Sequence, residues 1–241
     1  MKFSRRLQSR PRRPRWLRRL AVAALAGLLL TWLPVLILRF LRPPTSAFMV
    51  ERRMQAWRNA ESGFSLHQRF VPLAQMSPEL PIALVAAEDQ KFPLHHGFDF
   101  AAIGEAMDDA DDGARLRGAS TISQQVAKNL FLWNGRSFVR KGLEAYFTVL
   151  IEATWPKRRI LEVYANIAEF GNGVYGAEAA AQAYFRKTAV QLDAREAALL
   201  AATLPNPSLL RADRPSSYVL RRAAWIERQV RQLGGAAYLD R

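Results

Sequence analysis

The chain has 241 residues, a formal net charge of +14 and no cysteine. Eleven of its 35 Lys and Arg residues lie within residues 1–50, which contain no Asp or Glu, and the rest of the chain is nearly balanced in charge. This confinement of charge argues against a uniformly basic nucleic-acid-binding protein. The lack of cysteine excludes disulfides, and the residues after the first 40 suffice for one well-buried domain.

An apolar run without charges covers residues 20–38 and follows a strongly basic stretch at 1–19. As a helix, the run would be roughly 28 Å long, close to the thickness of the hydrocarbon core of a bilayer. A cleaved signal peptide would have a shorter apolar region and a small-residue cleavage site, whereas Arg-Phe-Leu-Arg follows here at 39–42. We therefore expect an uncleaved transmembrane anchor at 20–38 after a basic cytoplasmic tail at 1–19.

Prolines and hydroxyl residues predict a linker at 39–47, followed by a single domain at 48–241. Apolar residues recur at helical spacing through most of this domain, and no segment shows strong strand alternation, so we expect a mostly α fold. The expected segments are a helix leading into Glu88, a helical stretch over 103–110, a loop over 108–118, helices from near Ser120 and over 138–153, a helix with Pro156 in its first turn, a turn at 171–176, and helices at 177–185, 192–203 and 217–233.

Residues 88–97 combine side chains that neither a plain core nor a solvated surface needs: Glu88 and Asp89 are adjacent, and Phe92 and His95 follow. A carboxylate such as Glu88 can take a proton from an attacking hydroxyl when its surroundings raise its pKa. The plainer alternative is a helix end at the surface, with structural hydrogen bonds for Asp89 and His95. A second histidine next to His95, without a matching distant cluster, is weak evidence for a metal site.

Residues 118–129 are rich in hydroxyl and amide side chains and contain a single cation. On a helix beginning near Ser120, Thr121, Gln125 and Lys128 share one face, which can turn towards a cleft. Lys128 is a compact cation suited to a phosphate group. The alternative is an amphipathic surface helix, but such helices usually carry several charges.

Arg140 and Glu144 lie four residues apart on the helix expected over 138–153. Their plain interpretation is a surface ion pair worth a few tenths of a kcal/mol. The apolar cluster between Phe131 and Phe138, which includes Trp133, has two interpretations as well: a buried loop, or a loop that contacts a membrane.

Together these segments resemble the first three motifs of the peptidoglycan glycosyltransferases, glycosyltransferase family 51, with residues 140–144 as the third. Residues 157–176 resemble the fourth motif and residues 197–207 the fifth. The five motifs occur in order over about half of the chain. Residues 129–133 and 167–171 are most similar to the monofunctional branch of the family.

The resemblance implies a lysozyme-like glycosyltransferase domain with a small membrane-proximal lobe. It implies that the chain polymerises lipid II, with the growing lipid-linked glycan as donor, by inverting attack of an acceptor 4-hydroxyl and departure of the lipid pyrophosphate. Glu88 would be the general base, and Glu144 would be a second catalytic carboxylate whose detailed role stays open. The substrate-binding residues that it implies are Asp89, Phe92, His95, Ser120, Thr121, Gln125, Lys128 and Arg140.

The resemblance also implies a single-pass protein of the cytoplasmic (inner) membrane, with its N-terminus in the cytoplasm and its catalytic domain in the periplasm. Other cell-wall synthesis proteins are candidate partners, and nucleic acid is not. No cofactor is required; a divalent metal at the pyrophosphate is compatible with the reaction, but no ligand cluster implies one. No Ser-x-x-Lys motif occurs, and 34 residues follow Pro207, so we expect no transpeptidase activity. The rival functions are glycan cleavage on a related lysozyme-like fold and non-catalytic binding to the cell wall.

Overall fold

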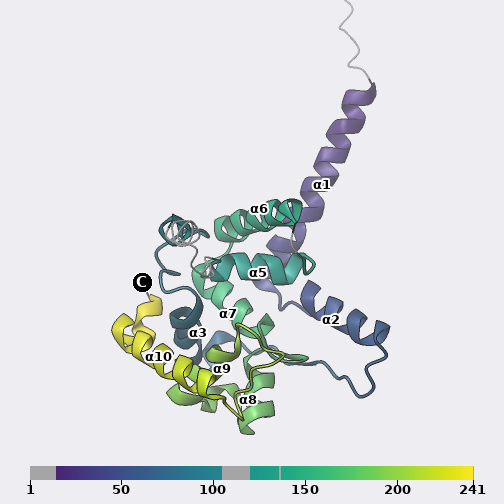
Figure 1. The fold of residues 1–241 in the computed structure, drawn as a ribbon. Helices are drawn as coiled ribbons and strands as arrows, with labels where there is room; N and C mark the ends of the chain where they lie inside the picture. The colour runs from purple at the N-terminus through teal and green to yellow at the C-terminus, as the bar shows by residue number, and fades with distance from the viewer. Residues whose placement is uncertain (1–14, 105–119, 136, 241) are drawn as a thin grey trace, which may run out of the picture. The chain divides into compact units, whose positions relative to one another are not determined.

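The computed structural model describes residues 15–104, 120–135 and 137–240, which fall into two compact units, residues 1–40 and 41–241 (Figure 1). The described part of the first unit is the helix α1 (Arg15–Phe40), which contains the apolar run and continues through Pro34. Among the described residues, α1 is the one helix long and apolar enough to cross a membrane. This is consistent with the predicted single-pass anchor.

The second unit is mostly helical, as the sequence predicts, with a small three-stranded sheet. Its α-helices are α2 (Ala47–Arg58), α3 (Glu79–Glu88), α5 (Ile122–Phe131), α6 (Phe138–Thr154), α7 (Lys157–Ile167), α8 (Ala177–Phe185), α9 (Ala194–Thr203) and α10 (Ser217–Leu233). The short 3-10 helices are η1 (Leu73–Gln75), η2 (Ala189–Gln191) and η3 (Gly235–Asp240). The helices predicted at 138–153, 177–185, 192–203 and 217–233 are confirmed within two residues at each end.

The helix α3 forms the centre of the second unit because it is apolar on all sides. Every residue from Leu80 to Ala86 is buried, and α3 packs against α7, α9, α10 and η3. A helix that is apolar around its whole circumference is stable only where other elements surround it. The polar residues start at its C-terminal end, so this burial places Glu88 where the core ends.

The helices α5 and α6 lie side by side (Figure 1). The residue that caps α5 is Thr121, one position later than the expected Ser120. Its hydroxyl accepts a hydrogen bond from the backbone N–H of Gln124, and the Gln124 side chain accepts one from the Thr121 N–H. Similarly, Pro156 caps α7 and does not lie within its first turn. Most of the helix and loop predicted at 103–118 lies outside the described residues.

The sheet joins β1 (His67–Gln68), β2 (Glu169–Gly171) and β3 (Val174–Tyr175) in the order β1-β3-β2. β1 is parallel to β3, and β2 is antiparallel to it. The predicted turn at 171–176 is the reversal of this hairpin and the start of α8, with Gly173 at φ +75°. The strands were not predicted, because two or three residues are too few to show the alternation of apolar and polar residues that is typical of a strand.

Candidate active site

The Glu88 carboxylate receives one hydrogen bond on each oxygen, from two different helices. Gln125 of α5 donates its Nε2–H to Glu88 Oε2 over 3.0 Å. Arg222 of α10 donates its Nη2–H to Glu88 Oε1 over 3.3 Å. The Glu88 side chain keeps 18% of its surface exposed, and it lines a cavity of about 860 Å³ with Pro205 and Trp225. The carboxylate is therefore fixed in orientation but remains accessible.

The orientation of Gln125 is set by Tyr164 of α7. The Tyr164 hydroxyl donates to Gln125 Oε1 over 3.1 Å, which turns the amide nitrogen towards Glu88. Tyr164 is fully buried, and this burial raises the pKa of its phenol well above the usual value. The hydroxyl therefore stays protonated and remains a donor, so α7, α5 and α3 are joined in one chain of hydrogen bonds.

Burial raises the pKa of Glu88 above the ordinary value for a glutamate, and the hydrogen bond from Gln125 and the charges of Arg222 and Lys128 oppose this rise. A carboxylate with a raised pKa is a stronger base than a solvated one. The surroundings thus shift the pKa of Glu88 in the direction that favours a general base, and they contradict the alternative of a solvated helix end.

Two cations, Lys128 of α5 and Arg140 of α6, line a second cavity of about 470 Å³ together with Glu51 and Asn134. Burial lowers the pKa of Lys128, the carboxylates of Glu144 and Glu88 oppose that change, and Arg140 adds to it. Lys128 is therefore within electrostatic reach of both predicted catalytic carboxylates. A partly desolvated pair of cations at a cavity is a suitable site for an anionic group.

Glu144 is buried and Arg140 is partly buried, so their pair is not the solvated surface ion pair of the alternative interpretation. Arg140 Nη1 lies 2.8 Å from Glu144 Oε2, and the two side chains are 12% and 4% exposed. Lys141 donates to the other oxygen of Glu144. Arg140 Nε is buried without a hydrogen-bond partner, so the guanidinium retains an unused donor. Glu144 is thereby occupied in holding two cations.

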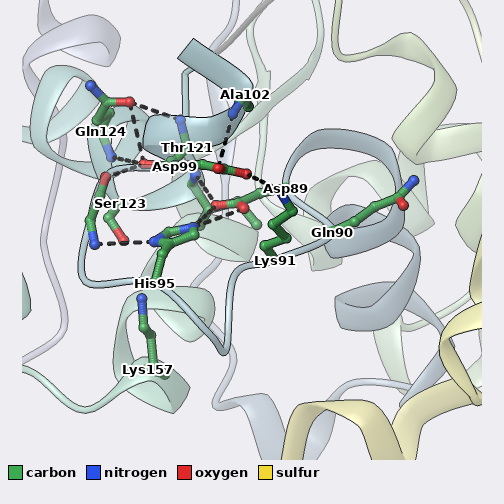
Figure 2. Close-up of polar contacts among 12 residues, drawn as sticks. Asp89, Gln90, Lys91, His95, Asp99, Ala102, Thr121, Ser123, Gln124 and Lys157 are labelled. Atoms are coloured by element: carbon green, nitrogen blue, oxygen red, sulfur yellow. Dashed lines mark hydrogen bonds and ion pairs between the residues drawn. The ribbon is translucent and has the colours of Figure 1, made fainter. Parts of the chain in front are cut away.

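Asp89 and His95 are engaged in contacts within the protein (Figure 2). His95 Nε2 lies 2.9 and 3.0 Å from the two oxygens of Asp89. The backbone N–H of Ile122 donates to Asp89 Oδ2 over 2.9 Å, and that of Gly97 donates to His95 Nδ1 over 3.1 Å. These bonds fasten the segment after α3 to the beginning of α5, which is the structural alternative considered for both residues.

Phe92 and Thr121 complete this supporting cluster. Phe92 is buried, and its ring meets the His95 ring edge-on at 6.3 Å between centroids. Thr121 is buried and donates its hydroxyl to Gly97 O over 2.6 Å. The expectation that Thr121 turns its hydroxyl towards a cleft beside Gln125 is therefore wrong, because the cap and this bond use it. Ser120 is exposed just before the helix.

Sequence reasoning missed two groups of polar residues. Arg222 lies on α10, outside all five motifs, and no sequence signal connects it with Glu88. Glu152, near the C-terminal end of α6, has a side chain that is 7% exposed. It accepts hydrogen bonds from Lys157 Nζ, over 2.7 Å, and from the Ser123 hydroxyl. The spacing of Glu152 and Lys157 could have been noticed, but the helix break between them hides the contact.

The apolar cluster after α5 is divided between the core and the surface. Leu132 is buried and Phe131 stacks on Phe147 with 4.6 Å between ring centroids. Trp133 is 50% exposed and Phe138 fully exposed. A wholly buried loop is therefore excluded, and an apolar surface patch remains.

A half-buried carboxylate with a raised pKa, within electrostatic reach of Lys128 at a second cavity that Arg140 also lines, provides the groups that a group transfer with an anionic leaving group needs. Comparison with known proteins agrees. The model of the transglycosylase family matches residues 56–231. A biosynthetic peptidoglycan transglycosylase of Xylella fastidiosa (strain 9a5c) is 57% identical over 93% of this chain and 93% of its own.

Two further relatives with the same name come from Xanthomonas. The protein of Xanthomonas euvesicatoria pv. vesicatoria (strain 85-10) is 58% identical over 95% of this chain and 93% of its own. That of Xanthomonas campestris pv. campestris (strain B100) is 56% identical over 97% and 96%. The chain therefore belongs to the transglycosylase family. The family prediction from the five motifs and the prediction of a glycosyltransferase are confirmed.

Proposed function

We propose that Glu88 is the general base with which this glycosyltransferase polymerises lipid II. The activity follows from the family: the chain builds peptidoglycan glycan strands. In the proposed step, the 4-hydroxyl of the acceptor attacks the anomeric carbon of the donor sugar and gives its proton to Glu88. The bond from that carbon to the lipid pyrophosphate breaks with inversion. The observation that carries the proposal is the fixed, half-buried carboxylate with a raised pKa at a cavity.

Lys128 and Arg140 are proposed to stabilise the negative charge that develops on the leaving pyrophosphate. Both line the smaller cavity, and Arg140 has an unused buried donor. Glu144 is proposed to act through Arg140, because its carboxylate holds that guanidinium in place. Among the described residues, no three His, Asp or Glu side chains gather as a metal site. The proposed role of Lys128 and Arg140 is compatible with any counter-ion that the substrate brings.

The presence of Lys128 and Arg140 at a cavity also favours polymerisation over glycan cleavage as the function. A hydrolase needs a proton donor for the leaving sugar and has no use for two cations at a cavity. The proposed roles of Asp89, Phe92, His95 and Thr121 are indirect. Their cluster positions the start of α5, and this helix carries both Gln125 and Lys128. A direct contact of Ser120 with substrate stays a prediction.

For its location, we propose that α1 crosses the cytoplasmic membrane with the basic residues 1–19 inside and the domain at 48–241 in the periplasm. The exposed Trp133 and Phe138 would then contact lipid close to the substrate's own lipid chain. The growing lipid-linked glycan would be the donor, and other cell-wall synthesis proteins are candidate partners. Protease added to spheroplasts should digest this domain; its protection would contradict the orientation.

The test of the function is the incubation of the purified full-length protein with lipid II. We expect glycan polymer and released lipid pyrophosphate, and no cleavage of added glycan strands. Glu88→Gln should reduce polymerisation at least about 10²-fold, the low end for the loss of a general base. Glu79→Gln, at the opposite end of α3, is the matched control. Polymerisation by a folded Glu88→Gln protein at the parent rate would remove Glu88 from this role.

A further inference from the structure

Arg222 reaches the proposed base from a helix that none of the five motifs includes. Its Nη2 lies 3.3 Å from Glu88 Oε1 and 3.5 Å from Ala87 O, and its side chain is 24% exposed. Its helix α10 is held against α3 and α9 through buried residues that include Ala223 and Ile226. Arg222 is therefore presented to Glu88 by a packed helix.

The two donors on Glu88 differ in kind. Gln125 is a neutral amide on Oε2, whereas Arg222 is a cation on Oε1. Hydrogen bonds from a charged donor to a carboxylate are roughly twice as strong as neutral ones. Gln125 thus orients the carboxylate, and Arg222 adds the opposite charge that a partly buried anion needs. A carboxylate can accept about four hydrogen bonds, so two occupied positions leave room for the substrate proton.

We propose that Arg222 is a positioning residue for catalysis: it holds the Glu88 carboxylate from the α10 side and places a positive charge against its Oε1. The inference rests on the proposed role of Glu88 as base. The guanidinium is not saturated by the fold, because its Nε is buried without a hydrogen-bond partner. An arginine that served the packing of α10 alone would be expected to use this donor as well. Instead, the side chain borders the larger cavity together with Glu88.

The other ionisable groups around Glu88 cannot replace Arg222. Lys128 of α5 acts on Glu88 through its charge, with no hydrogen bond between them among the contacts that the structure gives. Asp89 is adjacent but is bonded to His95, and Tyr164 of α7 stays neutral because burial raises its pKa. Arg221 lines the same cavity on the exposed side of α10. The contact with Oε1 therefore distinguishes Arg222 from the remaining charges.

The experiment measures kcat/KM for lipid II polymerisation against pH in the full-length protein and in Arg222→Met, Arg222→Lys and Arg228→Met. Arg222 lowers the pKa of Glu88, so the removal of Arg222 should raise that pKa. The acidic limb of the profile, where kcat/KM falls towards low pH, should then move to higher pH. On the acidic side, we expect Arg222→Met to lose about tenfold in kcat/KM, the effect of removing one opposite charge in contact. Activity should recover at alkaline pH, and Arg222→Lys should recover part of the loss.

The exposed Arg228 on the same helix makes Arg228→Met the control, which should keep the parent profile. If Arg222→Met unfolds, Arg222→Gln removes the charge while keeping a donor and gives the same test of the limb. If the acidic limb of Arg222→Met lies at the same pH as that of the parent, the inference is overturned, whether or not the rate falls equally at every pH. Glu88→Gln measured in parallel separates the two proposals. If Glu88→Gln polymerises at the parent rate, the proposed base is refuted. If Glu88→Gln is inactive but the acidic limb of the Arg222→Met profile stays at the parent pH, only the role of Arg222 is refuted.

Discussion

Glu88 and Asp89 are neighbours in the sequence, yet their surroundings differ in one decisive respect. Glu88 has one donor on each oxygen and borders a cavity. The Asp89 side chain is 3% exposed and is held by His95 and by the backbone N–H of Ile122. The first carboxylate can still receive a proton from a substrate, whereas the second is enclosed in the protein. This unused hydrogen-bonding capacity of Glu88, more than its presence in a motif, supports its proposed role as the base.

The same contrast separates the two cations from the cap of α5. Lys128 and Arg140 face a cavity, and Arg140 keeps an unused donor. Thr121 uses its hydroxyl twice within the protein, as acceptor from Gln124 and as donor to Gly97. Substitutions in the first group should therefore change the rate, and those in the second should change stability.

The largest effect in this comparison is expected from Lys128→Ala and Arg140→Ala. Each should lower kcat by about 10²- to 10³-fold, as does the loss of one group that stabilises developing negative charge. Arg140→Lys should also be costly, because an ammonium cannot reproduce the fork of the guanidinium. Steady-state polymerisation assays give kcat for each variant, and circular dichroism checks that each variant is folded. Parent rates in both alanine variants would show that the pyrophosphate lies elsewhere.

Asp89→Asn should act mainly on stability. It removes the charge that His95 and the Ile122 N–H contact, and unsatisfied buried groups of this kind cost about 1–3 kcal/mol. Chemical denaturation gives the free energy of unfolding. Under conditions where Asp89→Asn is folded, it should lose less polymerisation activity than Glu88→Gln does. A fully stable but inactive Asp89→Asn would instead place Asp89 in the reaction.

Thr121→Val keeps the volume of the side chain and removes the cap of α5. The expected loss is about 0.5–2 kcal/mol of unfolding free energy, the usual cost of an N-cap. Ser120→Ala, one residue earlier and exposed, is the matched control and should leave stability unchanged. Equal losses in the two variants would mean that the cap is shared.

The smallest effect concerns Glu88 itself and the pH dependence of stability. Because burial raises its pKa in the folded protein, the folded state binds more protons than the unfolded state between the ordinary and the raised pKa. Stability contributed by Glu88 is therefore complete below its unfolded pKa and is lost as pH rises through the folded one. Glu88→Gln lacks this loss, so its stability relative to the parent should increase with pH. A constant difference across this range would contradict the raised pKa.

Local patterns predicted much of the fold, because apolar periodicity reports the buried face of a helix. α8 and α10 begin and end where the spacing predicts, and the apolar run became α1. The position of Glu88 at the end of a buried helix was also predictable, from the apolar residues before it. The cap of α5 was misplaced by one residue because Ser and Thr are both good caps. The hydrogen bonds from Thr121 to Gly97 and from the start of α5 to Asp89 make Thr121, and not Ser120, the cap.

Contacts between distant segments could not be predicted from one sequence. Arg222 follows Glu88 by 134 residues, and only the packing of α10 against α3 brings them together. The amide orientation of Gln125 likewise depends on Tyr164, which lies on another helix. Such polar contacts follow from tertiary packing, and no spacing within a motif encodes them.

The measurement that tests the central claim most directly is the pH dependence of kcat/KM for lipid II polymerisation in the parent and in Glu88→Gln. If Glu88 is the base, the parent should show an acidic limb, since protonation of the free enzyme's base abolishes its function. In Glu88→Gln, the rate should fall at least about 10²-fold and the limb should vanish, leaving a low rate without that dependence. An acidic limb that persists at the parent pH in the folded variant would contradict the account.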